Sequence, residues 1–317
     1  MTNDAGRVRE GRLAFGLQLP VQAQSTLFVQ PWERGAGPVE LVAVARACEA
    51  AGFLYVAACD HVAIPRPQAD AMGTEWWDTI ATLSYLAAAT ERIRLLSHVY
   101  VLPYRHPLVA AKAFATLDAL SGGRAILGTG AGHVAGEFAA LDVPYEARGR
   151  LLDEAIDAVR AALRDEFPAH EGERWSFADL GQRPRPAQTS LPIWIGGSSP
   201  AAMRRAAQRG DGWLPQGPPE GGMEAGIAAV LEARAASERA GDPLVIGALS
   251  GPLHVGSPTW NAGRCFAGPP EKIAAYLRSY RDMGAHQVQV GFVSRSAQEL
   301  CDQIAAFAAD VAPLVND

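Results

Sequence analysis

An acidic and an imidazole side chain follow each other directly at Asp60 and His61, after the apolar run Tyr55–Ala58. A carboxylate beside an imidazole can tune proton transfer near neutral pH, because the acid orients the ring and stabilises its protonated form. The same spacing is also typical of an aspartate that caps a turn and a histidine that is merely partly exposed. His61 is therefore a candidate general acid or base, and the structural alternative stays open.

A second cluster could bind an anion. It reads Gly196-Gly197-Ser198-Ser199-Pro200 and joins a strand-like run to a helix-like one. Glycine permits a close approach of the backbone, Ser199 is placed to cap the helix, and Pro200 suits its first turn. Free N–H groups at a helix start bind phosphate without a lysine, and the chain has lysine only at Lys112 and Lys272. The cluster predicts a phosphate site, although an ordinary tight turn has the same residue types.

Room for a flat ligand is indicated at Gly128-Thr129-Gly130-Ala131-Gly132-His133, where the glycines would let a ring approach the backbone. His133 could face that ligand or lie at the solvent edge. Trp76 and Trp77 open a predicted helix and could wall a pocket for an aromatic ring. Adjacent residues on a helix point in different directions, so one of the two is expected in the core.

The elements that would position these residues follow from hydrophobic periodicity. Apolar strand-like runs alternate with longer amphipathic segments, which is typical of βα units. The predicted strands are Leu13–Leu19, Phe53–Ala58, Ile93–Val101, Arg124–Leu127, Pro192–Ile195, Gly212–Leu214, Leu244–Leu249 and Gln287–Phe292. The predicted helices are Pro38–Ala51, Trp77–Thr90, one after Pro107, Arg148–Asp165, one from Pro200, Met223–Arg239, Glu271–Met283 and Ala297–Ala308. Eight such units predict a (β/α)8 TIM barrel, whose active sites lie on the loops after the strands.

A doubly wound open sheet would show the same alternation, but it commonly carries a GxGxxG motif after its first strand. The first turn here is Leu19-Pro20-Val21-Gln22, without that motif. The barrel is therefore preferred, as a single domain over residues 1–317 with loop insertions at the C-terminal face of the strands. An irregular stretch at about 166–191 is interpreted as an insertion on the barrel.

Composition argues against several classes of function. The formal net charge is -6 and 49% of the residues are hydrophobic, which is typical of a globular enzyme and provides no basic patch for nucleic acid. The start, Met1–Arg12, is polar without a signal-like apolar core, and no later run approaches a membrane span, which favours a cytoplasmic location. The four cysteines have neither CxxC nor zinc-like spacing, so no metal site is predicted.

Several segments, in this order and spacing, resemble the luciferase-like monooxygenases and their deazaflavin-dependent relatives. They are Ser97–Pro107, Asp118–Arg124, Gly128–Gly130, Pro192–Gly197 and Gly210–Trp213. The resemblance extends from Leu13 to Phe307. It implies a bacterial-luciferase-like barrel with an isoalloxazine-like ring across its mouth and the cofactor phosphate at Gly196–Ser199.

The resemblance also implies roles for individual residues. Family members often have a cis peptide bond in the third strand, and the matching bond is His98–Val99. The expected cofactor-binding residues are Asp60, Ser97, His98, Val99, Thr129, Gly130, Gly196, Gly197, Ser198 and Ser199. The expected substrate pocket includes Gln18, Trp77 and His133.

The expected cofactor is coenzyme F420, with FMN as the alternative. Cys59-Asp60-His61 resembles the deazaflavin-dependent branch, in which the aspartate contacts the ring and the histidine is a proton donor. His133-Val134-Ala135-Gly136 departs from the pattern of the sugar-phosphate dehydrogenases of that branch. Together with the scarcity of lysine, this departure argues against a sugar phosphate as substrate.

The leading hypothesis is an F420-dependent oxidoreductase that moves a hydride between the deazaflavin and a small organic substrate, with His61 supplying or taking a proton. The alternatives are an FMN-dependent monooxygenase fed by a separate reductase, and a non-catalytic flavin-binding relative. The resemblance suggests a homodimer through the helices near the second and third βα units. Variable loops at Gln22–Gly37, Ile64–Glu75, Glu166–Leu191 and Ser250–Ala267 are expected to shape the substrate pocket, with Trp32, Trp260 and Phe266 as candidate lining residues.

Overall fold

The computed structural model describes residues 11–25 and 29–317, so most of the polar start and part of the Gln22–Gly37 loop lie outside the described residues. Eight parallel strands form the barrel. They are β1 (Ala14–Gln18), β2 (Tyr55–Ala58), β3 (Arg94–Ser97), β4 (Ala125–Thr129), β5 (Ile193–Gly196), β6 (Gly212–Leu214), β7 (Val245–Val255) and β9 (Gln287–Phe292). Successive strands pair around the ring, and β9 pairs with both β7 and β1, which closes it. The predicted (β/α)8 barrel is confirmed.

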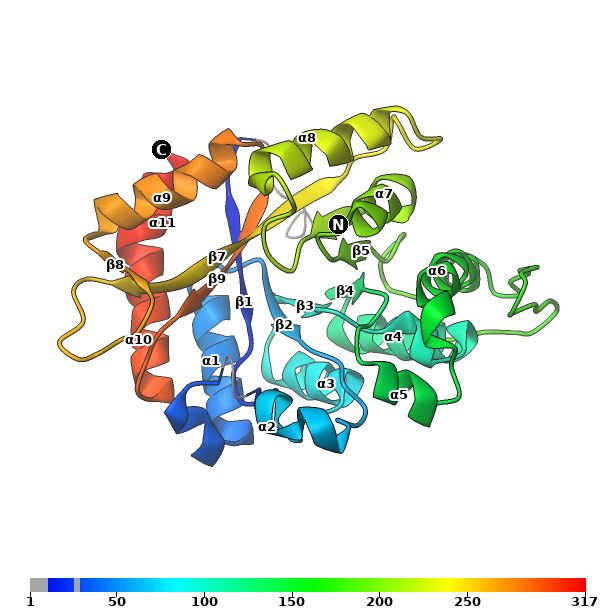
Figure 1. The fold of residues 1–317 in the computed structure, drawn as a ribbon, viewed down its shortest axis with the longest axis horizontal. Coiled ribbons are helices and arrows are strands. Elements are labelled where there is room, and N and C mark those ends of the chain that lie inside the picture. The colour runs from blue at the N-terminus through cyan, green and yellow to red at the C-terminus, as the bar shows by residue number, and fades with distance from the viewer. Residues whose placement is uncertain (1–10, 26–28) are drawn as a thin grey trace.

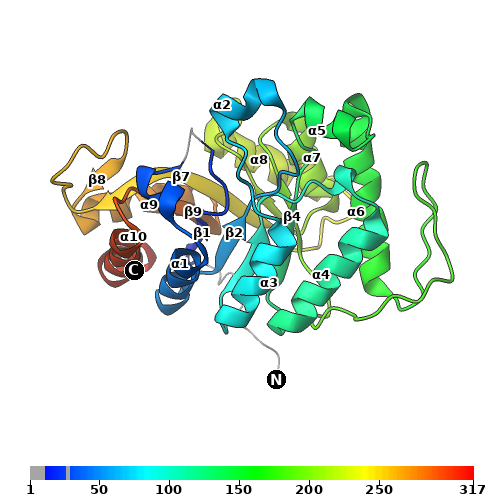
Figure 2. The same ribbon diagram turned by 90° about the horizontal axis from the view of Figure 1, so that it is seen from below.

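Helices surround the barrel on the outside (Figures 1 and 2). They are α1 (Pro38–Ala50), α2 (Ala69–Met72), α3 (Thr79–Ala89), α4 (Pro107–Ser121), α5 (Ala135–Ala140), α6 (Arg148–Arg164), α7 (Pro200–Arg209), α8 (Gly222–Ala235), α9 (Pro270–Asp282), α10 (Ala297–Ala306) and α11 (Ala312–Asn316). The buried face of α1 consists of Leu41, Val44, Ala45 and Cys48, as their helical spacing predicts. The main hydrophobic core therefore lies between the strands and this ring of helices.

A smaller cluster fills the inside of the barrel. Its buried members are Tyr55, Ala57, Leu96, Ile126, Trp194 and Leu214. Strand residues alternate between the two faces of a sheet, so Val56 and Ala58 belong instead to the outer core. The same alternation directs the next inward positions, such as His98 two residues beyond Leu96, towards the mouth at the C-terminal ends of the strands.

The exit from β2 into α3 differs from the sequence-based expectation. The helix begins at Thr79 rather than at Trp77, because Asp78 caps it and its side chain accepts a hydrogen bond from the Ala81 N–H at 2.8 Å. Both tryptophans therefore precede the helix. Their directions are set by the loop and not by helical geometry.

The segment 166–191 contains an isolated bridge between His170 and Phe177 but no helix or longer strand. It extends beside α6 and leads into the start of β5 (Figure 1). Gln188 within it contacts the starts of two other strands, accepting from Arg94 at 2.6 Å and donating to the Ala125 carbonyl at 2.9 Å. The Trp175 ring packs against His106 before α4, so the insertion runs along the outside of the helices. None of its residues lines the cavity at the barrel mouth, and the expectation that it shapes the substrate pocket is wrong.

The predicted loop Ser250–Ala267 is also corrected. Strand β7 continues to Val255, and β8 (Phe266–Gly268) pairs with this extension, with Leu253 opposite Phe266. A register irregularity between Leu249 and Pro252 marks where β7 leaves the barrel proper. Strand β7 therefore extends beyond the barrel mouth, where Ser250 and Pro252 border a cavity.

Candidate active site

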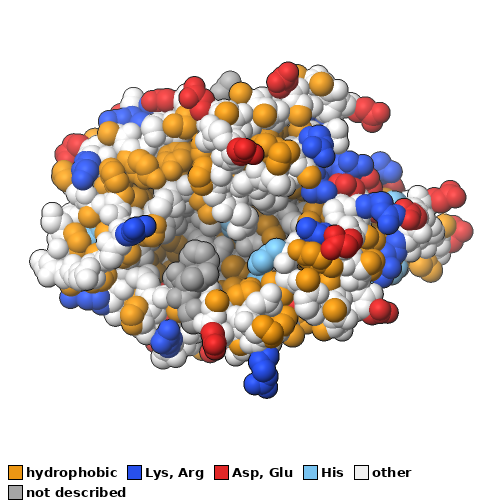
Figure 3. Space-filling model, in the orientation of Figure 1, with side chains coloured by type: hydrophobic (Ala, Val, Ile, Leu, Met, Phe, Trp, Pro, Cys, Tyr) orange, Lys and Arg blue, Asp and Glu red, His pale blue; other side chains and the backbone are white. Residues whose placement is uncertain are grey.

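A cavity of about 970 Å³ opens at the C-terminal ends of the strands. The space-filling view shows this face hollowed at its centre, with histidine atoms inside the hollow (Figure 3). Ten of the predicted site residues line it: Gln18, Asp60, His61, His98, Val99, Gly130, His133, Gly196, Gly197 and Ser199. The structure thus brings together residues from the ends of β1, β2, β3, β4 and β5, as the barrel requires.

Three predicted cofactor-binding residues do not line the cavity but support its walls. The Ser97 hydroxyl donates to the Gly128 carbonyl at 2.8 Å, which joins β3 to β4. The Thr129 hydroxyl donates to the Tyr100 carbonyl at 2.8 Å. The Ser198 hydroxyl donates to the carbonyl of Gly217 at 2.6 Å. Each of these hydroxyls is used inside the protein, which is why it does not face the cavity.

Trp76, and not the predicted Trp77, lines the cavity. Trp77 packs against the outer core, and its Nε1 lies 3.4 Å from the Glu75 carboxylate. The three further aromatic candidates also lie outside the lining. Trp32 donates to Ser294, Trp260 lies beside Arg295, and Phe266 packs on Tyr276.

The His61 ring is held by Glu137, a residue that the sequence did not single out. Their Nδ1 and Oε2 atoms are 2.7 Å apart, and the Glu137 side chain is fully buried. The same carboxylate accepts the N–H groups of Val62 at 2.6 Å and Ala63 at 3.1 Å, and the Tyr104 hydroxyl at 3.2 Å. With Nδ1 engaged, Nε2 is the nitrogen of His61 that can serve a ligand in the cavity.

The charge of Glu137 follows from these partners. Burial raises the pKa of its carboxyl, but the hydrogen bond and charge of His61 and the N–H groups of Val62 and Ala63 outweigh burial, so that the pKa is lowered. An ionised Glu137 fixes the orientation and tautomer of His61, as second partners of catalytic histidines generally do. The only signal in the sequence was its place just after Gly136 in the loop behind the fourth strand.

Two more rings pack around His61. The Trp76 ring centroid is 4.3 Å away and that of His133 is 5.6 Å away. Burial, and then the neighbouring His61, lower the pKa of His133, with Glu137 acting in the opposite direction. His61 therefore occupies an aromatic corner of the cavity in which His133 favours its neutral form.

Asp60 is already paired within the protein. Both of its oxygens accept from the Arg105 guanidinium at 2.7 Å, and Oδ2 also accepts the Val101 N–H at 2.8 Å. The side chain is 2% exposed, so its charge is balanced by Arg105 rather than by water. Asp60 thereby joins the end of β2 to the segment after β3, and the predicted contact with a cofactor ring remains a prediction.

The floor between β3, β4 and β5 is shaped by two glycines. The His98–Val99 peptide bond is cis, as the resemblance implied. A Cβ at Gly130 would lie 2.8 Å from a methyl of Val99, and one at Gly196 would lie 2.4 Å from the other methyl. Both glycines therefore leave room for the Val99 side chain to pack against their backbone, and the three residues together form one wall of the cavity. This cradle fits a flat ring system of the flavin or deazaflavin type.

The predicted phosphate loop follows β5. Gly197 has φ of 109°, a conformation suited to glycine, and its carbonyl accepts from Trp213 Nε1 at 2.9 Å. Ser199 caps α7 by accepting the Ala202 N–H at 3.2 Å. Arg205 lines the same end of the cavity, with its guanidinium 2.6 Å from Asp153. The start of α7 is therefore anchored, and the positive end of its dipole lies at the cavity, which suits an anionic group.

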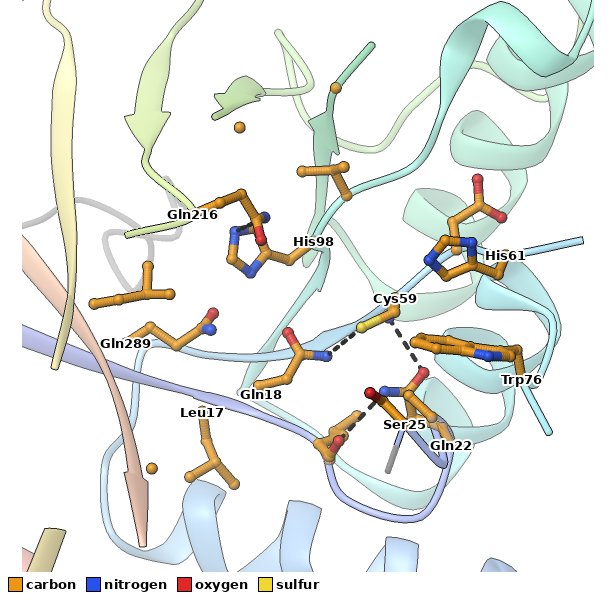
Figure 4. Close-up of a pocket in the computed structure, with 18 of the residues that line it drawn as sticks. Leu17, Gln18, Gln22, Ser25, Cys59, His61, Trp76, His98, Gln216 and Gln289 are labelled. Atoms are coloured by element: carbon orange, nitrogen blue, oxygen red, sulfur yellow. Dashed lines mark hydrogen bonds between the residues drawn. The ribbon is translucent and has the colours of Figure 1, made fainter. Parts of the chain in front are cut away.

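Neutral polar side chains form the middle of the cavity. Figure 4 shows Gln18, His98, Gln216 and Gln289 turned towards one another across the barrel mouth. Gln216 Nε2 lies 2.9 Å from His98 Nε2, and Gln18 donates to the Ala57 carbonyl at 3.0 Å. Burial lowers the pKa of His98 to about 4, despite hydrogen bonds with the Gln289 side chain and the Leu214 backbone. Gln216 and Gln289 were missed because glutamines at strand ends carry no motif.

Comparison with known proteins gives the family. The family model for luciferase-like monooxygenases matches residues 15–259, and the chain belongs to this family. An uncharacterised protein of Mycobacterium tuberculosis is 33% identical over 185 residues, which cover 55% of this chain and 64% of that protein. The match thus spans less than two thirds of that relative.

Two further relatives are named for an activity. An F420-dependent hydroxymycolic acid dehydrogenase of Mycobacterium tuberculosis is 35% identical over 59% of this chain and 54% of its own. An F420-dependent glucose-6-phosphate dehydrogenase of Intrasporangium calvum is 33% identical over 58% of this chain and 56% of its own. This chain spans a little over half the length of each of these two relatives.

Three solved structures share the fold. F420-dependent tetrahydromethanopterin reductase of Methanopyrus kandleri has a TM-score of 0.74 and 18% identity, over 95% of this chain and 99% of its own. An F420-dependent secondary alcohol dehydrogenase has a TM-score of 0.77 and 16% identity, over 96% and 100%. A riboflavin lyase with modified FMN has a TM-score of 0.77 and 16% identity, over 96% and 91%.

Within residues 11–25 and 29–317, no helix has the length and apolar character needed to cross a membrane.

Proposed function

We propose that this protein is an F420-dependent oxidoreductase that transfers a hydride between the deazaflavin and a small organic substrate. The observation that carries the proposal is His61, which is held by the buried Glu137 and lines the same cavity as the glycine cradle at Gly130 and Gly196. The F420-dependent relatives support the choice of cofactor. When bound, the deazaflavin would supply a two-electron hydride donor or acceptor.

The chain's own residues would bind and orient the cofactor. Gly130, Val99 and Gly196 form the surface on which the ring would rest, since a Cβ at either glycine would collide with Val99. The positive end of the α7 dipole, next to Gly197 and Ser199, would favour the phosphate at that end of the cavity. Arg205 adds positive charge at that end of the cavity while it remains paired with Asp153.

Proton transfer is assigned to His61. Hydride transfer to or from a carbonyl or alcohol requires a proton to move at the substrate oxygen, and His61 Nε2 can hold or release it. Glu137 acts as a positioning residue, because its ionised carboxylate binds Nδ1 and stabilises the ring when it carries the extra proton. Trp76, with its ring centroid 4.3 Å away, limits the water that can reach the imidazole.

The cofactor assignment is tested by binding. Oxidised F420 and FMN are titrated separately into the protein, and their fluorescence is followed. We expect saturable binding of F420 at a concentration at least tenfold lower than for FMN. Tight FMN binding without F420 binding would refute the proposal and favour the reduced-flavin monooxygenase. F420 binding without turnover across an alcohol and ketone panel would favour a non-catalytic relative.

A further inference from the structure

We infer that the substrate of this cavity is an uncharged molecule with a hydroxyl or carbonyl oxygen on an extended apolar skeleton, and that carboxylates and phosphates are rejected as substrates. This inference rests on the proposed function, which assigns the glycine cradle and the start of α7 to the cofactor. The remaining part of the cavity, next to β1, β7 and β9, is then the space for the substrate.

The cavity has few charged side chains, and those of Asp60 and Arg205 are paired within the protein. Among its described lining residues, only Glu33, Asp60 and Arg205 are acidic or basic apart from histidines. Arg205 is bound to Asp153, and Asp60 is bound in two contacts to Arg105. An anionic substrate would therefore lose its hydration without meeting an unpaired cation, and such burial of an unpaired charge is strongly unfavourable.

Glu33 increases this bias against anions. Its side chain is buried and accepts the N–H groups of Val21 and Gln30, both at 2.9 Å. Burial raises the pKa of its carboxyl against the effect of these two hydrogen bonds. Whether protonated or ionised, Glu33 offers no positive charge to a ligand.

The histidines of the lining supply no unpaired positive charge either. His61, when protonated, faces the ionised Glu137 at 2.7 Å, so that the pair is neutral overall. His98 has a pKa lowered by burial to about 4, and His133 has a lowered pKa for the same main reason. At neutral pH the lining formed by the described residues is therefore polar at its centre and contains no unpaired cation.

The polar groups at the centre suit a neutral oxygen. Gln18, Gln216 and Gln289 surround His98, as Figure 4 shows. A carboxamide has both donors and an acceptor, so it can donate to a carbonyl oxygen or accept from a hydroxyl without any change of charge. Such a group can accommodate both members of an alcohol and carbonyl pair, whereas a charged side chain would favour one ionic form of a ligand.

The substrate space also has an apolar part. It is lined by Leu17, Leu19, Leu249, Val290, Phe292 and Leu300. In Figure 4, Leu17 lies on the opposite side of Gln18 from His61. A substrate with its oxygen near Gln18 and His61 would therefore extend its apolar part towards β1 and β9. The total cavity, about 970 Å³, is near the upper end of the ~300–1,000 Å³ typical of ligand pockets, which leaves space for both molecules.

The test compares four ligands with similar chains: octan-2-one, octan-2-ol, octanoate and octyl phosphate. Their binding is measured by isothermal titration calorimetry, with the cofactor-free protein and again after loading with oxidised F420. We expect the ketone or the alcohol to bind at least tenfold more tightly than both anions. Equal or tighter binding of either anion to the loaded protein, or no binding of the neutral compounds at millimolar concentration, would overturn the inference.

A variant that is expected to gain affinity for an anion separates a change in ligand preference from a loss of folding. Leu249→Arg places a cation in the apolar part of the cavity and should improve octanoate binding at least tenfold while weakening that of octan-2-one. Leu231→Arg is the matched control, because Leu231 is exposed on α8 and does not line the cavity. The inference fails if both variants have the ligand preference of the parent.

Gln289→Leu removes a polar group from the centre of the cavity and tests whether that group binds the substrate oxygen. It should weaken octan-2-one and octan-2-ol binding by about tenfold, and Gln298→Leu on the exposed face of α10 should not. Failure of F420 to bind would refute the proposed cofactor. The change in octanoate and octan-2-one binding between the parent and Leu249→Arg, both free of cofactor, would still test the uncharged substrate space. The two proposals can therefore fail separately.

Discussion

The Glu137 carboxylate lies 2.7 Å from His61 Nδ1, although 76 positions separate the two residues in the chain. His61 follows β2, and Glu137 lies on the short helix α5 behind β4. Neither loop could hold the pair by itself. The contact exists because the barrel places the C-terminal ends of both strands at the same mouth. It gives the His61 ring a fixed orientation.

Replacement of His61 should separate chemistry from binding. We expect His61→Ala to reduce the turnover number by roughly 10²–10⁴-fold, which is typical for loss of a general acid or base, with F420 affinity changed less than threefold. Steady-state kinetics and fluorescence titration measure the two effects. His170→Ala, in the insertion remote from the cavity, is the control and should change neither. Equal losses of turnover and affinity would show that His61 is structural.

Glu137 should contribute a pH-dependent stabilisation. Its folded pKa lies below the ordinary 4.5, so the stabilisation is complete above that value and is lost as the pH falls through the folded pKa. Urea unfolding at pH 7 and at successively lower pH measures it. We expect Glu137→Gln to be less stable than the parent at pH 7, and the difference should shrink in acid. A constant difference at all pH values would contradict this assignment.

The glycine cradle can be tested with one methyl group. Gly196→Ala would place a Cβ 2.4 Å from Val99, so we expect a loss of roughly 1–3 kcal/mol in the free energy of unfolding and at least tenfold weaker F420 binding. Gly251→Ala is the control, since a Cβ there meets nothing within 4 Å. Unchanged F420 affinity in a folded Gly196→Ala protein would show that the cofactor ring does not lie against Gly196.

Asp60 and Arg105 should behave as a coupled pair. Asp60→Asn leaves the Arg105 guanidinium without its bidentate partner, and removal of one partner of a buried pair costs ~3–5 kcal/mol. We expect a value at the lower end, because the Arg105 side chain is 19% exposed. A double-mutant cycle with Arg105→Gln, measured by urea unfolding, should show that the double variant loses less than the sum of the single losses. Additive losses would mean that the contact is not energetically coupled.

Replacing two helix-capping serines in turn separates an effect on stability from an effect on phosphate binding. Ser199 caps α7 and Ser296 caps α10, each through its side chain. Replacing either by Ala should cost about 0.5–2 kcal/mol of unfolding free energy. Only Ser199→Ala should also weaken F420 binding, because the start of α7 borders the cavity. A similar affinity in both variants would place the cofactor phosphate elsewhere.

Local patterns in the sequence were sufficient to predict the barrel architecture. Apolar runs predicted the eight barrel strands and helical spacing predicted the helices, because a strand buried on both faces is apolar throughout and a helix buried on one face has apolar residues at helical spacing. The extra strand β8 was missed, since Phe266–Gly268 has three residues and depends on the extension of β7. Residue types also indicated the glycine floor and the α7 cap, since both are requirements of a few adjacent positions.

Only the tertiary structure decided which side chains meet. It paired His61 with Glu137 and Asp60 with Arg105, and it turned Trp76 rather than Trp77 into the cavity. It also kept the insertion 166–191 out of the lining of the cavity. These outcomes depend on barrel closure and on the directions of loops, because side chains distant in sequence become neighbours only when the strands that carry them are aligned.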